Sequence, residues 1–123
     1  MFKILLGHFR RSKLSEEAFW AYYNRLPDKI QVAWFRSDNY IVGKVNVDGK
    51  EYFTQGNNAN DFINMVNDLV ITICEIPNDY VAIIKESRTY EPLLEERNKL
   101  EDNRINHSVI GFRKTQKKHL QYA

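Results

Sequence analysis

The stretch Tyr52-Phe53-Thr54-Gln55-Gly56-Asn57-Asn58-Ala59-Asn60-Asp61-Phe62 runs from a predicted strand through a tight turn into a predicted amphipathic helix. Gly56 allows a sharp turn because it has no Cβ to clash, and Asn57 or Asn58 is placed to cap the helix with its side-chain oxygen. The helix then carries one apolar stripe at intervals of three and four residues, made of Ala59, Phe62, Ile63, Val66, Leu69, Val70 and Ile73. This segment fixes the centre of the fold as a strand followed directly by a core helix.

Three predicted strands precede this helix and form an antiparallel meander. Residues 30–36 are rich in β-branched and aromatic side chains, which favour a strand. In residues 41–47, alternate positions place an apolar set on one face. Asp48-Gly49 is a strong hairpin signal, because both central residues of a type I′ turn need a positive φ. Residues 50–54 return as the third strand, and the single apolar face of such a meander needs a helix to cover it.

Further elements are predicted on both sides of this core. Ser15, followed by two glutamates, is typical of a helix start, and this helix ends at Pro27. Residues 80–84 predict a fourth strand, Glu91-Pro92 predicts the first turn of a C-terminal helix, and residues 108–112 allow one more short strand. The fold class is α+β: an antiparallel β-meander of three strands backed by an amphipathic helix, then a fourth strand and a C-terminal helix, with an N-terminal helical extension.

Size and composition indicate one ordinary globular domain. The chain has 123 residues, of which 43% are hydrophobic and 28% charged, and these values are typical of a single folded unit. No apolar run is long enough to predict a membrane span. The apolar start over residues 1–7 stops at His8, before Arg10 and Arg11, so we interpret it as mature structure and not as a signal peptide. The single cysteine, Cys74, excludes an internal disulfide framework and favours a cytoplasmic location.

Basic residues are concentrated at the C-terminal end of the chain. We predict a single α+β domain over residues 1–102 and a basic tail over residues 103–123, which holds no acidic residue. Such a tail is a candidate for binding nucleic acid or an acidic protein face, although a solvated terminus explains the same composition. The candidate phosphate contacts are Arg104, Arg113, Lys114, Lys117 and Lys118.

Four aromatic residues crowd the predicted N-terminal helix, at positions 19, 20, 22 and 23. Together they extend over more than half of the helix circumference, so a one-sided core does not account for all of them. Either the set packs on the sheet with Tyr22 at the rim, or Trp20 and Tyr22 form part of a protein interface, where aromatic anchors are favoured.

No pattern of residues predicts a metal site, a cofactor or catalysis. The histidines His8, His107 and His119 lack the spacing of metal ligands. His8 beside Arg10 and Arg11 resembles the arrangement in which a ribonuclease moves a proton and stabilises phosphate charge, and this is the enzymatic alternative. We expect a protein without enzyme activity and without a cofactor.

The residues from Asp38-Asn39-Tyr40-Ile41-Val42 through Phe53-Thr54-Gln55-Gly56 to Leu69-Val70 resemble the antitoxin family called HicB. That family has a strand, a tight turn, a second strand, a third strand that ends in Thr-Gln-Gly, and a capped helix directly after it. The resemblance covers residues 30–73 and places a HicB-like core at about residues 30–85. The family's usual C-terminal DNA-binding unit is not recognisable in this sequence.

The resemblance implies a non-enzymatic domain that binds a small toxin-like ribonuclease and neutralises it by covering its active face, as a homodimer or a larger assembly. The sequence therefore predicts a cytoplasmic, HicB-like interaction protein that binds a small partner protein and no membrane. The alternative is a nucleic-acid-binding regulator, including a DNA-binding one, that uses the basic C-terminal tail.

Overall fold

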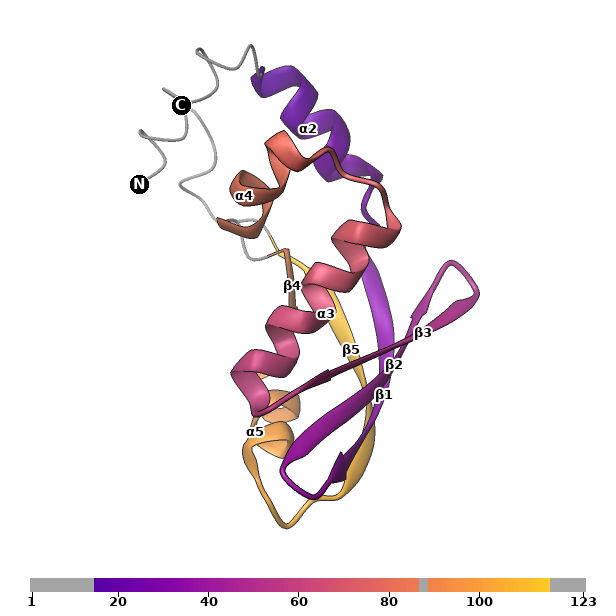
Figure 1. Ribbon diagram of the computed structural model, residues 1–123, viewed down its shortest axis with the longest axis vertical. Coiled ribbons are helices and arrows are strands. Elements are labelled where there is room, and N and C mark those ends of the chain that lie inside the picture. The colour runs from indigo at the N-terminus through magenta and orange to yellow at the C-terminus, as the bar shows by residue number, and fades with distance from the viewer. Residues whose placement is uncertain (1–14, 87–88, 116–123) are drawn as a thin grey trace.

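A computed structural model of the chain describes residues 15–86 and 89–115 (Figure 1). In chain order the elements are α2 (Glu16–Arg25), β1 (Lys29–Ser37), β2 (Tyr40–Val47), β3 (Lys50–Gly56), α3 (Ala59–Ile73), α4 (Asn78–Glu86), β4 (Tyr90–Pro92), α5 (Leu94–Glu101) and β5 (His107–Lys114). The strands form one antiparallel sheet in the order β3-β2-β1-β5-β4. The α+β class predicted from the sequence is therefore confirmed.

The predicted meander is present as β1, β2 and β3. Asp48 and Gly49 have φ angles of 51° and 83°, so both central residues of the β2–β3 turn are left-handed, as a type I′ turn requires. β2 then pairs with β3 without interruption from Val47↔Lys50 to Ile41↔Gly56. The local turn signal in the sequence thus sets the register of the whole hairpin.

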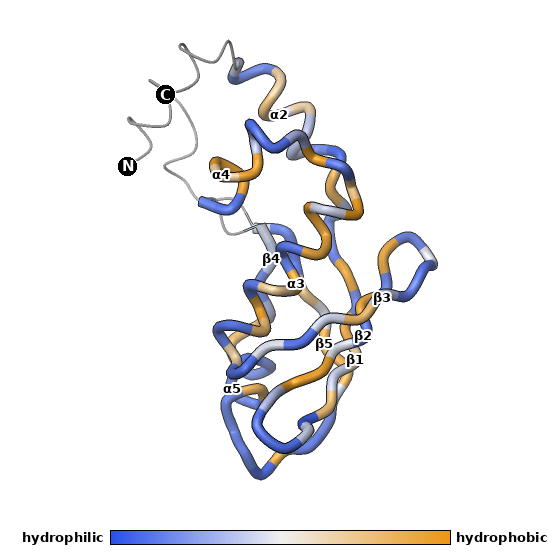
Figure 2. The backbone as a smooth tube through the Cα atoms, in the orientation of Figure 1, coloured by the Kyte–Doolittle hydropathy of each residue, from blue (hydrophilic) through white to orange (hydrophobic). Residues whose placement is uncertain are grey.

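The helix α3 covers this meander, and its start is capped as the sequence predicts. The Asn58 side chain accepts a hydrogen bond from the Asp61 backbone N at 2.9 Å, and the Asp61 carboxylate accepts one from the Asn57 backbone N at 2.8 Å. These bonds satisfy backbone N–H groups that a helix start leaves without partners. Phe62 and Val70 are fully buried, and Figure 2 shows hydrophobic residues recurring along α3.

The first turn of α3 lies very close to the sheet because two glycines face it. A Cβ added at Gly56 would lie 2.4 Å from both the backbone N and the Cα of Phe62, and a Cβ added at Gly43 would lie 2.4 Å from the tip of the Phe62 ring. Both distances are too short for real atoms. The two glycines therefore allow the fully buried Phe62 to pack directly on β2 and β3.

The fourth strand predicted over residues 80–84 is wrong, because this segment lies inside the helix α4. Tyr80, Ile83 and Ile84 are the buried residues of α4, and their spacing of three and four places them on one helical stripe. The Tyr80 backbone N donates to the Pro77 carbonyl at 2.9 Å at the start of this helix. A short apolar run fits a strand or a buried helix equally well by periodicity, and here packing against the core decides for the helix.

The C-terminal region also differs from the prediction. Residues Tyr90–Pro92 form β4, so the helix expected to open at Glu91-Pro92 begins later, at Leu94. The short strand allowed over residues 108–112 is confirmed and extends over the whole of β5. β5 lies between β1 and β4 and buries Ile110 and Phe112 in the core. Residues 107–114 are therefore part of the sheet and not of a separate basic tail, because this apolar pair needs the core.

The helix α2 is tied to the sheet by buried tyrosines. The Tyr23 hydroxyl donates to the Thr115 carbonyl just after β5, and the Tyr90 hydroxyl donates to the Pro27 carbonyl at 2.5 Å. Burial raises the pKa of Tyr23 to about 12, and burial also raises the pKa of Tyr90. Each phenol remains protonated and donates to a carbonyl over a wide pH range.

The close contact between Gly56 and Phe62 makes a direct prediction for stability. We expect Gly56→Ala to lower the free energy of unfolding by about 1–3 kcal/mol, because the added methyl group meets backbone atoms that have little freedom to move. Gly111→Ala is the matched control, since no atom lies within 4 Å of the Cβ position there. Urea denaturation of both variants measures the difference, and equal stability of the two would contradict the proposed contact.

The raised pKa of Tyr23 predicts a loss of stability at alkaline pH. An unfolded tyrosine ionises near its ordinary pKa of 10.0 and folded Tyr23 at about 12, so the unfolded state loses its proton first. The stabilisation is complete below pH 10 and is lost as the pH rises towards 12. In Tyr23→Phe, which keeps the ring, the free energy of unfolding should fall less steeply over this window. If the free energy of unfolding fell equally steeply with pH in the two proteins, this explanation would be wrong.

Candidate functional site

The helix α3 covers one face of the sheet. None of the helices in the described residues, 15–86 and 89–115, covers the other face. The covered side holds the buried strand positions Ile30, Val32, Trp34, Ile41, Val45, Val47, Ile110 and Phe112. Successive side chains of a strand alternate between the two faces, so the intervening positions lie on the opposite side, which we call the open face. Phe35, Phe53 and Val109 lie there with 49%, 69% and 59% of their surface exposed.

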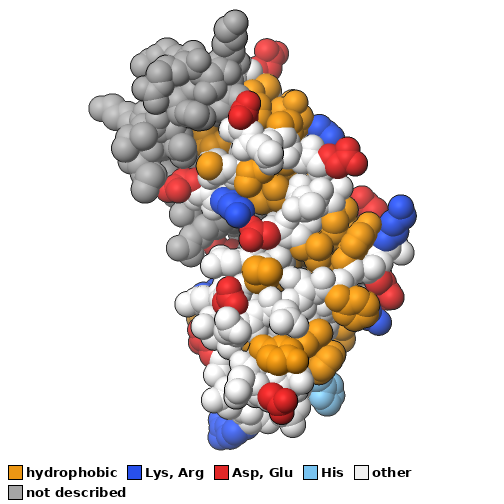
Figure 3. Space-filling view, in the orientation of Figure 1, with side chains coloured by type: hydrophobic (Ala, Val, Ile, Leu, Met, Phe, Trp, Pro, Cys, Tyr) orange, Lys and Arg blue, Asp and Glu red, His pale blue; other side chains and the backbone are white. Residues whose placement is uncertain are grey.

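The strand register brings these apolar side chains together in two neighbouring rows across the sheet. One row runs Phe53, Lys44, Ala33 and Val109, and the next runs Gln55, Val42, Phe35 and His107. Directly opposite residues in neighbouring strands have Cβ atoms about 4.5–5.5 Å apart, so each row is continuous. Figure 3 shows hydrophobic side chains gathered over the strands at the lower right of the view.

Polar groups lie within this patch as well as beside it, since Lys44 stands between Phe53 and Ala33 in one row. The Lys44 ammonium lies 3.6 Å from the Glu51 carboxylate, and both side chains are about half exposed, so this pair contributes little to stability. The next row across the sheet, on the side of the β2–β3 turn, consists of Glu51, Asn46, Gln31 and Gly111. The first three of these residues are polar, and the glycine has no side chain. A surface that combines exposed aromatic and aliphatic side chains with polar ones is the usual composition of a protein–protein contact.

The two predicted interface residues of the N-terminal helix lie elsewhere, against other aromatic rings. The Trp20 ring packs edge-on against Phe19 and Tyr23, with centroids 4.8 Å and 5.5 Å apart. The Tyr22 ring lies 5.0 Å from the Tyr80 ring of α4. Both Trp20 and Tyr22 are half-buried and pack against the core, so they do not join the open-face patch.

Lys114, a predicted phosphate contact, lies at the end of α2 instead of at the surface. Its ammonium donates to the carbonyls of Tyr23 and Leu26 at 3.1 Å and 2.9 Å, and its side chain is only 10% exposed. Burial lowers the pKa of Lys114, an effect that the nearby Asp28 carboxylate opposes. A cation at the last carbonyls of a helix stabilises that end, so Lys114 has a structural partner and is not placed to meet a phosphate.

Of the other predicted basic contacts, the structure describes Arg104 and Arg113, and these two have different surroundings. The Arg104 guanidinium donates to both oxygens of Asp102, at 3.0 Å and 2.9 Å, and these hydrogen bonds lower the pKa of Asp102 to about 2. Arg113 is exposed on the open face, where its strand partners are Lys29 and Glu91. Arg104 precedes β5, whereas Arg113 lies near the far end of this eight-residue strand. Lys117 and Lys118 lie outside the described residues, as do His8 and His119.

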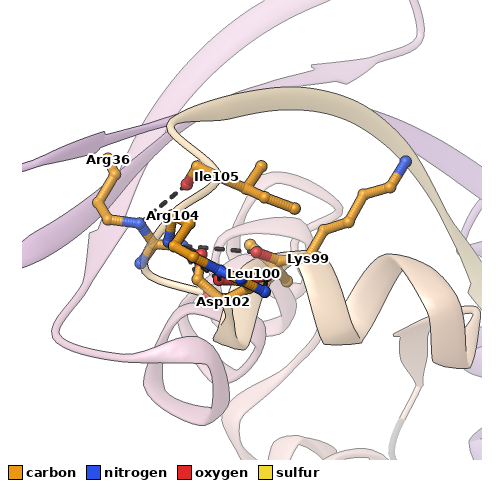
Figure 4. A network of polar contacts seen from close by, with 6 residues as sticks. All are labelled: Arg36, Lys99, Leu100, Asp102, Arg104 and Ile105. Carbon is orange, nitrogen blue, oxygen red and sulfur yellow. Dashed lines mark hydrogen bonds and ion pairs between the residues drawn. The ribbon is translucent and has the colours of Figure 1, made fainter.

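Arg36, which no sequence pattern singled out, organises the region around Arg104 (Figure 4). Its Nε donates to the Ile105 carbonyl at 3.1 Å, and its Nη2 donates to the carbonyls of Leu100 and Asp102 at 3.0 Å and 3.1 Å. One side chain on β1 thus binds the end of α5 and the loop after it. Its position in the sequence was the available signal. Every second residue of β1 points to the core, and Arg36 is the next such position after Trp34.

Potential metal ligands are not gathered at one place in residues 15–86 and 89–115. No group of three or more His, Cys, Asp or Glu side chains in this part of the chain could hold a metal ion. Burial raises the pKa of the half-buried Cys74, which disfavours the reactive thiolate form. A polar cleft of ≈ 730 Å³ lies between the start of α3 and the loop after α5, lined mainly by asparagines.

Within residues 15–86 and 89–115, no helix is both long and apolar enough to cross a membrane.

The structural role of Lys114 predicts a difference between two neighbouring lysine and arginine substitutions. We expect Lys114→Gln to lower the free energy of unfolding by about 1–3 kcal/mol, because charge-assisted bonds to two carbonyls are lost. Arg113→Gln, one residue away and exposed, should change it by less than about 0.5 kcal/mol. Urea denaturation of both variants measures this. If Lys114→Gln were as stable as Arg113→Gln, Lys114 would not have the assigned role.

Compared with known proteins, the chain matches no family model, no curated protein and no solved structure.

Proposed function

We propose that this chain is a non-catalytic protein-binding module that holds a small partner protein on the open face of its sheet. The observation that carries the proposal is the exposure of Phe35 on β1, Phe53 on β3 and Val109 on β5, all on a face of the sheet that no described helix covers. Single exposed apolar residues are ordinary on protein surfaces, but several large ones gathered on one face mark a candidate interaction site.

The shape of this surface favours a macromolecular partner over a small ligand. Small-molecule sites are concave and enclose most of the ligand surface, whereas the open face is one broad side of a five-stranded twisted sheet (Figure 1). Aromatic residues at its centre, Phe35 and Phe53, are of the kind that anchors protein interfaces. A partner that buries them contributes hydrophobic stabilisation in proportion to the apolar area removed from water.

The resemblance of residues 30–73 to HicB supplies a more specific form of the proposal. In that role the chain is an antitoxin-like protein of the cytoplasm, and its partner is a small ribonuclease-type toxin. The open side of a five-stranded sheet suits this role, because covering an active face needs a broad surface and no catalytic group. Neutralisation would then result from binding alone.

The nucleic-acid alternative has weaker support. Binding through phosphates needs cations gathered on one surface. Lys114 is bonded to the end of α2, and Arg104 and Arg113 are separated by the length of β5. The protein-binding proposal is therefore the better supported of the two.

Affinity capture from nuclease-treated lysate of the native host tests the proposed surface. We compare the wild-type chain, the double variant Phe35→Ser/Val109→Ser, and the control Leu94→Ser, whose side chain is 73% exposed on α5, away from the open face. The wild type and the control should retain one small protein in stoichiometric amount. The double variant should lose it at least about tenfold, since buried apolar anchors each contribute 1 kcal/mol or more.

Two results would contradict the proposal. One is a partner captured equally by all three proteins, which would place the contact elsewhere. The other is recovery of nucleic acid from untreated lysate with release at high salt, which would favour the nucleic-acid alternative because phosphate-driven binding weakens steeply with salt. Thermal unfolding of each variant, measured alongside, confirms that the folded protein is being compared.

A further inference from the structure

The sheet has two edges, and the strands that form them are protected very differently. At one edge β4 has only the three residues Tyr90–Pro92 and contains a proline, two features that prevent further strand pairing. At the other edge β3 has seven residues, no proline and an uninterrupted register with β2. Its charged residues, Lys50 and Glu51, are confined to the end next to the turn. β3 is thus a long strand with an accessible edge.

The type I′ turn determines which backbone groups of β3 point away from β2. In a two-residue hairpin the residues that flank the turn, Val47 and Lys50, exchange both hydrogen bonds. Bonded and non-bonded pairs then alternate along the hairpin. Glu51, Phe53 and Gln55 therefore direct their N–H and C=O groups to the free side, and all three residues are exposed.

We infer that β3 pairs antiparallel with β3 of a second copy of this chain, with the two-fold axis at Phe53, to form a symmetric homodimer with one continuous sheet. Phe53 is the middle residue of β3, and it is one of the residues with free backbone groups. With the axis there, Phe53 faces its own copy and Glu51 faces Gln55 of the other copy. The outward-directed residues of both strands then meet as hydrogen-bonded pairs.

The charges of β3 select this register over its neighbour. With the axis at Phe53, Lys50 faces Gly56 and Glu51 faces Gln55, so no like charges are opposed. With the axis at Glu51, two carboxylates would lie directly opposite each other, which is unfavourable in a sheet. An axis at Gln55 would leave much of β3 unpaired. The register centred on Phe53 also brings two exposed phenyl rings together on the open face, as a cross-strand aromatic pair.

This inference concerns a second copy of the chain and does not depend on the proposed partner protein. Edge pairing leaves the open face accessible and joins the open faces of the two copies side by side. Because its test uses the purified chain alone, the failure of either proposal would leave the other standing.

The first test changes one exposed residue in two directions. In the proposed register Gln55→Glu opposes Glu51 of the other copy at two places in the dimer, while Gln55→Lys creates two attractive pairs. We expect sedimentation equilibrium of the full chain to show a wild-type dimer, a dissociation constant raised about threefold to tenfold by Gln55→Glu, and one lowered by Gln55→Lys. A wild-type chain that is monomeric at every concentration, or equal effects of the two variants, would overturn the inference.

The second test locates the two-fold axis. In Phe53→Cys the two introduced cysteines would lie opposite each other, with Cα atoms about 5.5 Å apart, within the range for a disulfide. In Glu51→Cys, a control two residues away on the same strand, the introduced cysteines would be far apart. Under mild oxidation only Phe53→Cys should form a covalent dimer beyond the level that wild-type Cys74 gives. Equal cross-linking of the two variants, or none in either, would overturn the assigned register.

Discussion

The contact between Phe62 and the glycines of β2 and β3 is the constraint on which the rest of the structure depends. Because Gly56 has no side chain, the chain passes directly from β3 into α3 with the backbone of Phe62 against it, and Gly43 leaves room for the ring. α3 is thereby fixed to one side of the meander. β5 can then pair with β1 and turn Ile110 and Phe112 toward the same core. The described helices consequently gather their apolar residues into one cluster, and the opposite face is left open.

The same one-sided arrangement explains the placement of two cations. Helices that pack on a sheet leave the carbonyls of their last turn without intrahelical partners. Lys114 binds such carbonyls at the end of α2, and Arg36 binds them at the end of α5. Both basic side chains therefore hold helices on the sheet. A basic C-terminal composition, which suggests a nucleic-acid contact when it is read in isolation, is in part a consequence of how the layers are joined.

The open face and the free edge of β3 are two distinct surfaces that meet at Phe53. The side chain of Phe53 belongs to the open face, whereas its backbone groups belong to the edge. A second copy at the edge and a partner protein on the face are therefore compatible. If both form, the patches of the two copies lie on the same side of one extended sheet, and two partner molecules can be held side by side. Such bivalent binding raises the apparent affinity without any new contact.

By itself the sequence determined the features that depend on neighbouring residues. The Asp48-Gly49 turn, the Asn58 cap and the apolar stripe of α3 were predictable, because positive φ angles, side-chain capping and helical periodicity are local properties. Tertiary structure alone decided the rest. The five residues 80–84 form a helix because they pack against a core contributed by distant segments. β5 belongs to the sheet because it pairs with β1, more than seventy residues earlier in the chain. The partners of Lys114 and Arg36, and the exposure of Phe53, follow from which elements meet in space, and single-sequence patterns carry no information on such non-local contacts.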